Sequence, residues 1–150
     1  MTVYAIDTNL LVYAHNFDSP FHEKAKNFLE RVMNGQNTDE GITICIPAQV
    51  LTEFVSVITW QRLEKPLSLP QATDVIKDYL NSGVRIITQR ETYINNFIDL
   101  MEKVTARKKI FDVALAATLK DNEIQGLYTV NVSDFEGFDF LKVVNPLELP

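Results

Sequence analysis

The sequence of 150 residues has only one cysteine, Cys45, and no long hydrophobic run. A lone cysteine cannot form a disulfide within the chain, and Cys45 lies in the apolar run 42–46, where a thiol usually packs as a small hydrophobic side chain. No apolar run approaches the roughly 20 residues that cross a bilayer, and the stretch 2–14 is interrupted by Asp7 and lacks a basic leader segment. We therefore expect a soluble, cytoplasmic protein with no membrane partner.

Positive charge is also scarce, because 14 Lys and Arg stand against 20 Asp and Glu, a net charge of −6. Proteins that hold nucleic acid by bulk charge usually carry a clearly basic face, so this balance argues against that class. It does not exclude an enzyme that handles phosphates through metal ions, since the excess acids can belong to the metal site. With 46% hydrophobic residues, the chain can fold as one domain, 1–150, and global disorder is excluded.

Motifs of several other enzyme classes are absent. The sequence contains no Walker loop, no GxGxxG, no HExxH and no GxSxG, so it lacks the usual signatures of P-loop nucleotide binding, dinucleotide binding, zinc proteolysis and serine hydrolysis.

Short β-prone runs alternate with segments of helical periodicity along the chain. Strands are predicted at 2–6, 42–46, 84–88 and 127–130, with a short edge strand within 138–144. Helices are predicted at 8–15, 20–34, 47–63, 72–83, 91–105 and 110–119, with polar connectors at 36–41 and 65–70. This alternation predicts an α/β fold with a central parallel sheet covered by helices on both faces. The helix 110–119 is apolar nearly all round and is expected to be buried between layers. Trp60 is expected in the core, and a dimer surface is the second interpretation.

Two aspartates lie close to the ends of predicted strands. Asp7 directly follows the run 2–6, and Asp134 comes shortly after 127–130. In open α/β sheets ligands bind beyond the carboxyl ends of the strands, so both positions are candidates for a functional site. For either residue alone, a helix-capping or turn carboxylate is at least as good an interpretation.

Glu53 lies on a predicted helix, at the border of its apolar stripe. It comes three residues after Val50 and four before Val57, both of which belong to that stripe. A glutamate at such a border either extends into solvent or meets a cation, and helical periodicity does not decide between the two.

Asp112 is the only charged residue between Lys109 and Lys120, in an otherwise apolar helix. An acid in a first helical turn is stabilised by the helix dipole, and Lys108, four residues earlier, offers a weak salt bridge. The alternative is that Asp112 points into a polar cleft shared with the other acids.

These acids are suited to a hard divalent cation. Mg²⁺ and Mn²⁺ prefer carboxylate oxygens and retained waters, and their sites need several acids but no Cys or His. Two such ions roughly 4 Å apart can activate a water and stabilise the leaving oxygen of a phosphodiester, so a site of this kind needs no nucleophilic side chain.

Four motifs occur in a recognisable order along the chain: IDTN at 6–9, TEF at 52–54, IFD running into ALAAT at 110–118, and TVNVSDF at 129–135. Their order and spacing resemble those of PIN-domain ribonucleases, and among these the chain is most similar to the VapC toxins of bacterial and archaeal toxin–antitoxin pairs. No single motif is specific, but the ordered set covers essentially the whole chain. The resemblance implies a PIN-like three-layer domain and a metal-dependent endoribonuclease.

The resemblance also implies a site that binds Mg²⁺ or Mn²⁺ through an acidic quartet: Asp7, Glu53, Asp112 and Asp134. Asp7 and Asp112 would be the principal metal ligands. Glu53 would hold a ligand water or activate the attacking one, and Asp134 would act through water or a second ion. The polar positions that orient these carboxylates match Thr8, Asn9, Thr129 and Asn131.

The partners implied by the resemblance are an RNA substrate, a second copy of the chain in a homodimer, and a small antitoxin protein. An arginine of the antitoxin would make bidentate hydrogen bonds to the quartet, while the rest packs on helices such as 19–34 or 47–63. Arg107, Lys108 and Lys109, just before Asp112, either contact RNA phosphates or form a solvated turn between helices, and both interpretations stay open.

Two other functional classes compete with the ribonuclease. A haloacid-dehalogenase-like phosphatase also places an aspartate after its first strand, but it needs a second aspartate two residues on, where this chain has Asn9. A PIN-like scaffold that binds RNA or a partner without cleaving is the other alternative. The presence of all four acids speaks against it, and metal-dependent cleavage is the property that discriminates.

Overall fold

A computed structural model describes residues 2–34 and 41–148. Within them, five parallel strands form one sheet in the order β3-β2-β1-β4-β5. The strands are β1 (Thr2–Ile6), β2 (Ile42–Pro47), β3 (Arg85–Ile87), β4 (Gly126–Tyr128) and β5 (Lys142–Val144). The central strand is β1, whose Ala5 pairs with Cys45 of β2 on one side and Leu127 of β4 on the other. The predicted α/β fold with a parallel sheet is confirmed.

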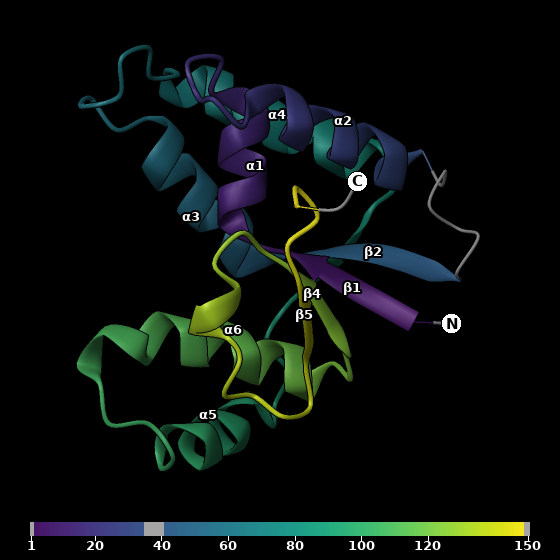
Figure 1. The fold of residues 1–150 in the computed structure, drawn as a ribbon, viewed down its shortest axis with the longest axis vertical. Helices are drawn as coiled ribbons and strands as arrows, with labels where there is room; N and C mark the ends of the chain where they lie inside the picture. Colours follow the sequence, from purple (N-terminus) through teal and green to yellow (C-terminus); the bar gives the residue numbers. More distant parts are fainter. Residues whose placement is uncertain (1, 35–40, 149–150) are drawn as a thin grey trace.

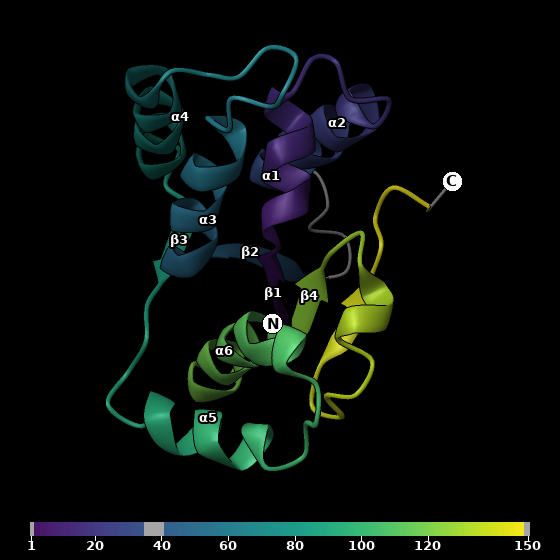
Figure 2. The same cartoon turned by 90° about the vertical axis from the view of Figure 1, so that its left-hand side faces the viewer.

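Helices cover both faces of the sheet and complete three layers (Figures 1 and 2). One face carries α1 (Thr8–His15), α2 (His22–Met33), α3 (Ala48–Ile58) and α4 (Leu69–Asn81). The other carries α5 (Tyr93–Met101) and α6 (Ile110–Asp121), and two single-turn 3-10 helices, η2 (Arg107–Lys109) and η3 (Val132–Asp134), flank this layer. None of the described helices has both the length and the apolar character needed to span a membrane.

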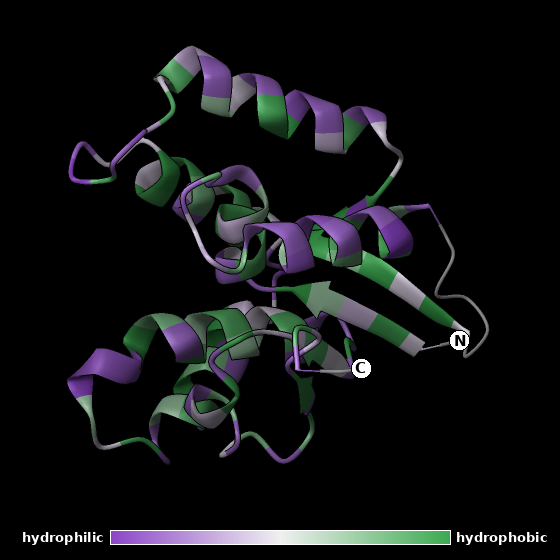
Figure 3. Cartoon of the chain, turned by 45° about the horizontal axis from the view of Figure 1, so that its top comes forward, coloured by the Kyte–Doolittle hydropathy of each residue, from purple (hydrophilic) through white to green (hydrophobic). Residues whose placement is uncertain are grey.

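The core lies between these layers. Figure 3 shows the strands as largely hydrophobic, whereas the helices of the outer layers mix hydrophobic and hydrophilic positions. Ile6, Cys45 and Leu127 of the sheet and Val113 of α6 are completely buried, and most of the residues of α6 that follow Val113 are buried too. Burial raises the pKa of the Cys45 thiol to about 12, so it is an unreactive core residue, as the sequence predicts.

Two aromatic residues depart from the predicted burial. Trp60 is 54% exposed, because α3 ends at Ile58 and Trp60 lies in the turn beyond it. Phe111 is 73% exposed although the rest of its helix is largely buried, since it lies in the first turn of α6, at the edge of the layer.

Several element boundaries also differ from the prediction. The helix predicted from 72 begins at Leu69, because Ser68 and Gln71 form a reciprocal capping box and Pro70 fits the first helical turn. The helix predicted from 20 begins at His22, and the one predicted over 91–105 is confined to Tyr93–Met101. The polar connector predicted at 36–41 lies, apart from Gly41, outside the described residues.

The strand order places a topological switch point beside β1. From β1 the chain moves to β2 and β3 on one side of the sheet, and then to β4 and β5 on the other. At such a point the connections leave in opposite directions and open a crevice at the carboxyl ends of the strands. Asp7 directly follows β1 and Thr129 directly follows β4, so both lie at this crevice.

Candidate active site

Asp7 is held in place by three hydrogen-bond donors. It is the N-cap of α1, accepting the Thr8 backbone N–H at 2.8 Å. The Thr129 hydroxyl donates to its Oδ2 at 2.7 Å, and the Asn9 side-chain amide lies 3.4 Å from the same oxygen. The Asp7 side chain is therefore a helix cap, which is one of the two interpretations of the sequence. It is also a carboxylate at the switch point that is only 8% exposed.

The electrostatic environment of Asp7 disfavours its negative charge. Burial, followed by repulsion from the Glu53 and Asp112 carboxylates, raises the pKa of Asp7 to about 6, although the hydrogen bonds from Thr129 and Thr8 oppose the shift. A cation bound beside Asp7 would relieve both the desolvation and the repulsion.

Thr129 and Asn9 form a small network behind Asp7. The Asn9 amide donates to the Thr129 hydroxyl oxygen at 3.1 Å, and its carbonyl oxygen accepts the Val130 backbone N–H at 3.2 Å. Asn131 contributes its backbone N–H to the Thr129 hydroxyl oxygen at 3.1 Å, while its own side chain is exposed. Three of the predicted supporting side chains thus contact the quartet or its network, whereas Asn131 acts through its backbone.

Glu53 is half-buried on α3 and meets two neutral donors. The Thr8 hydroxyl donates to Oε2 at 2.9 Å, and the Gln49 amide donates to Oε1 at 3.0 Å. Gln49 also lies 3.3 Å from the carbonyl oxygen of Phe111, which links α3 to the start of α6. Sequence reasoning missed Gln49, although its position four residues before Glu53 on the same helix was a usable signal.

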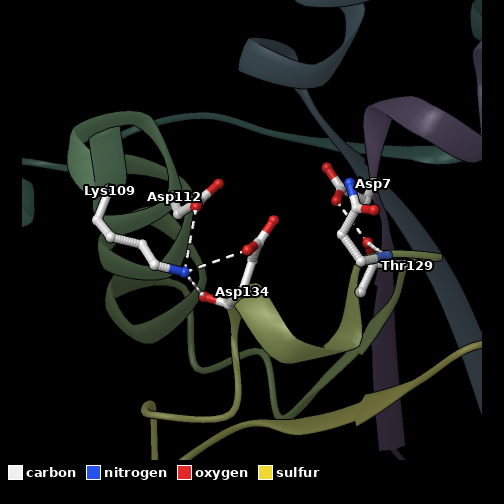
Figure 4. A network of polar contacts seen from close by, with 6 residues as sticks. Asp7, Lys109, Asp112, Thr129 and Asp134 are labelled. Atoms are coloured by element: carbon white, nitrogen blue, oxygen red, sulfur yellow. Dashed lines mark hydrogen bonds and ion pairs between the residues drawn. The ribbon is translucent and has the colours of Figure 1, made fainter. Parts of the chain in front are cut away.

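Asp112 and Asp134 share one cation, the Lys109 ammonium (Figure 4). Nζ lies 3.2 Å from Oδ1 of Asp134, 3.1 Å from the Asp134 carbonyl oxygen and 3.9 Å from Oδ2 of Asp112. The expected pairing of Asp112 with Lys108 is wrong. Lys108 is exposed in the 3-10 turn η2, and Lys109, the N-cap of α6, has the shorter i,i+3 relation to Asp112.

The four acids form one electrostatically connected group. Burial first, then the Asp134 carboxylate and more weakly Glu53, raise the pKa of Asp112, while the Lys109 ammonium opposes the shift. Because Glu53 and Asp112 also act on Asp7, the structure brings acids from α1, α3, α6 and η3 to one crevice. Of the predicted basic residues, Arg107 and Lys108 are exposed beside it, and Lys109 is engaged with the acids.

All the charged ligand atoms that this crevice offers are carboxylate oxygens, the donors that Mg²⁺ and Mn²⁺ prefer. In the described part of the chain, no three or more His, Cys, Asp or Glu side chains converge closely enough to hold a single ion. The residues fit a hard cation because they offer oxygen donors, and because a bound cation would offset the burial and the mutual repulsion of their charges. The side-chain positions do not form a closed coordination shell.

Fold and site together define a three-layer α/β domain with an acidic, oxygen-lined crevice at the switch point of its sheet. The sequence model of the PIN domain matches residues 4–136, and the chain belongs to the PIN domain family. This membership sets aside the haloacid-dehalogenase alternative.

Individual relatives agree with this assignment. The chain is 26% identical over 144 residues to a protein named Ribonuclease VapC24 from Mycobacterium tuberculosis, covering 95% of this chain and 96% of the relative. A crystal structure of M. tuberculosis VapC20, described as a Sarcin-Ricin loop cleaving toxin, is similar with a TM-score of 0.63 at 13% identity, covering 90% and 95% of the two chains. A toxin–antitoxin complex from Klebsiella pneumoniae contains a chain with a TM-score of 0.61 at 18% identity, covering 99% and 100%.

Proposed function

We propose that this chain is a metal-dependent endoribonuclease and the toxin component of a VapBC-type toxin–antitoxin pair, with residues 1–150 as one PIN domain. The observation that carries the proposal is the buried Asp7 carboxylate, held by Thr8 and Thr129 and facing the charges of Glu53 and Asp112. Membership in the PIN family and similarity to a relative named as a ribonuclease support it.

In this proposal Asp7 and Asp112 hold Mg²⁺ or Mn²⁺, with Glu53 and Asp134 completing the set. A bound ion would supply an activated water and charge stabilisation for the phosphodiester. Thr8 connects two of the acids, since its backbone N–H binds Asp7 and its hydroxyl binds Glu53. The Thr8 and Gln49 side chains hold the two oxygens of the Glu53 carboxylate, which would accept a proton from the attacking water.

The Lys109 ammonium has a separate role in the proposal. It offsets the charges of Asp112 and Asp134, which reduces repulsion in the metal-free protein. Arg107 and Lys108, exposed in the same turn, contact phosphates of the RNA.

The proposed partners are a small antitoxin and a second copy of the chain. The similarity to a chain from a toxin–antitoxin complex supports an antitoxin. An arginine of that partner is suited to the carboxylates of the crevice, because a guanidinium makes bidentate hydrogen bonds to a carboxylate.

The decisive experiment is incubation of the purified protein with total RNA, with Mg²⁺, with Mn²⁺ and with EDTA, followed by mapping of the cut ends. Asp7→Asn is expected to lower the rate by at least about 10²-fold, as when one preorganised electrostatic contact is lost. Asp74→Asn is the matched control, since its exposed carboxylate lies on α4 and pairs with Lys77. RNA binding without cleavage in either metal would favour the non-catalytic scaffold.

A second experiment tests the toxin assignment. Expression in a bacterial host should arrest growth, and co-expression of the small gene adjacent to this one should restore it. Restoration that persists after the arginines of that small protein are replaced would contradict the proposed contact with the quartet.

A further inference from the structure

A cavity of about 500 Å³ opens directly beside the acidic crevice. Its walls come from the end of α5 and the connector to η2, from Lys120 of α6, and from the segment that follows η3. Two of its lining residues link it to the four acids: Asp134 is one of them, and Lys109 forms ion pairs with Asp112 and Asp134. The cavity and the crevice therefore share a wall, and a chain-like ligand can occupy both at once.

The charge of the cavity is opposite to that of the whole protein. Three lysines line it, Lys103, Lys109 and Lys120, against two aspartates, Asp134 and Asp139. Lys109 is occupied by its carboxylate partners, but Lys103 and Lys120 are exposed and form no ion pair with any described residue. Together with Asp139 in the same wall, these two ammonium groups leave a net positive charge, in a chain of net charge −6, and so form a local site for an anion such as a phosphate.

An aromatic ring lies beside these lysines. Phe140 is half-buried in the cavity wall, and its ring is supported by the buried Phe138, with 6.5 Å between the centroids. The Lys120 ammonium lies over the Phe140 ring, 6.0 Å from its centroid, so a base that stacks on this face takes the place of the ammonium, which is then free to bind a phosphate. A ring held at this position next to a cation offers a flat apolar surface for a nucleobase together with a charge for its phosphate.

We propose that this cavity binds one nucleotide of a single-stranded RNA, adjacent to the phosphodiester that the acidic crevice receives. Lys103 and Lys120 bind the phosphate, and the base stacks on Phe140. The inference rests on the proposed ribonuclease function and extends it to a substrate subsite. The cavity volume falls within the roughly 300–1,000 Å³ typical of pockets for small ligands. An acidic peptide would use the lysines equally well but would have no use for the Phe140 ring, so the pairing of ring and lysines favours RNA.

The test measures binding separately from cleavage. Fluorescent single-stranded oligoribonucleotides are titrated in EDTA, so that the probe stays intact, and the affinity is measured by anisotropy at several salt concentrations. The Lys103→Ala, Lys120→Ala double variant should lower the slope of log K against log salt by about 0.7, since the two lysines bind one phosphate and each phosphate contact on a single strand contributes about 0.7. Phe140→Leu keeps an apolar side chain but removes the ring, and should weaken binding about tenfold.

Lys24→Ala is the matched control, because Lys24 is exposed on α2, in the opposite helical layer. It should leave both affinity and slope unchanged, and thermal unfolding checks that every variant is folded. If the lysine and Phe140 variants bind RNA with the same affinity and salt slope as Lys24→Ala, and the wild-type protein cleaves RNA, the subsite is wrong and the ribonuclease proposal stands. A wild-type protein that neither binds nor cleaves RNA would overturn both.

Two further outcomes would also reject the subsite. If the lysine variant loses affinity while Phe140→Leu retains it, the surface binds any polyanion and no base is stacked. If the lysine variant binds RNA normally but loses binding to a polyglutamate probe, the cavity is a site for an acidic peptide.

Discussion

The Thr129 hydroxyl donates a 2.7 Å hydrogen bond to Oδ2 of Asp7, across 122 positions of sequence. This bond joins the ends of β1 and β4, the two strands that border the switch point. Thr129 is completely buried, and the Asp7 carboxylate is the acceptor that its hydroxyl proton meets.

Thr129→Val should therefore destabilise the protein at pH 7, because it leaves the buried Asp7 carboxylate short of a donor. Such a loss typically costs about 1–3 kcal/mol, and it should also raise the pKa of Asp7 further, since this hydrogen bond opposes the upward shift. Urea unfolding measures the cost. Thr129→Ser keeps the hydroxyl, so its free energy of unfolding should fall less than that of Thr129→Val. Equal decreases in the two variants would mean that the threonine methyl group, and not the hydrogen bond, provides the stability.

Asp7→Asn should change how stability depends on pH in metal-free protein. Because the pKa of Asp7 is raised from 3.8 to about 6 in the fold, the native state binds this proton more tightly than the unfolded chain. The associated stability is fully present below pH 4 and is lost as the pH rises through 6. The free energy of unfolding of Asp7→Asn, measured relative to that of the wild type, should therefore rise by up to about 3 kcal/mol from pH 4 to pH 7. Urea unfolding in EDTA at both values measures this, and a difference that is constant with pH would contradict it.

Gly126→Ala should destabilise the sheet at the contact between β4 and β1. A Cβ at this position would lie 2.5 Å from the Tyr4 ring, and Tyr4 is only 4% exposed, so the ring has little room to move. Overpacking of this kind costs about 1–3 kcal/mol. Gly137→Ala is the control, since a Cβ there meets nothing within 4 Å. Thermal unfolding should separate the two variants by several degrees.

Asp121→Ala should reduce stability without changing the chemistry of the crevice. This carboxylate, at the end of α6, accepts hydrogen bonds from the Arg90 backbone, the Thr92 hydroxyl and the Asn96 amide, and so ties the start of α5 to α6. Arg90 and Thr92 are exposed and can bind water instead, so the loss is the net value of these hydrogen bonds and should cost about 1–2 kcal/mol. Asp112→Asn, in contrast to Asp121→Ala, should abolish RNA cleavage and leave the fold intact. If Asp112→Asn lowered the melting temperature and left cleavage intact, Asp112 would be only a helix-terminus residue.

The fold could be predicted from the sequence because its elements carry local signals. The run 2–6 ends at a charge, and the apolar helix that follows Lys109 fits a position between layers. The contacts within the site could not be predicted in the same way. The pairing of Lys109 with two acids depends on the 3-10 turn before α6, and the contact of Gln49 with the Phe111 carbonyl depends on how α3 and α6 meet. Periodicity places a residue on the face of a helix but does not identify its partner on another element.

The position of β1 between β2 and β4 also sets an order of events during translation. As the chain leaves the ribosome, β1 can pair with β2 early, but β4 is made long afterwards. Until β4 docks, Asp7 lacks the hydrogen bond from the Thr129 hydroxyl, and the second edge of β1 has no partner strand. Because β4 and η3 follow β1 by more than a hundred residues and pairing between strands so distant in sequence is slow, the four acids come together only after both segments have been made. A ribosome making this protein thus carries the disassembled parts of the acidic crevice until η3 has been made.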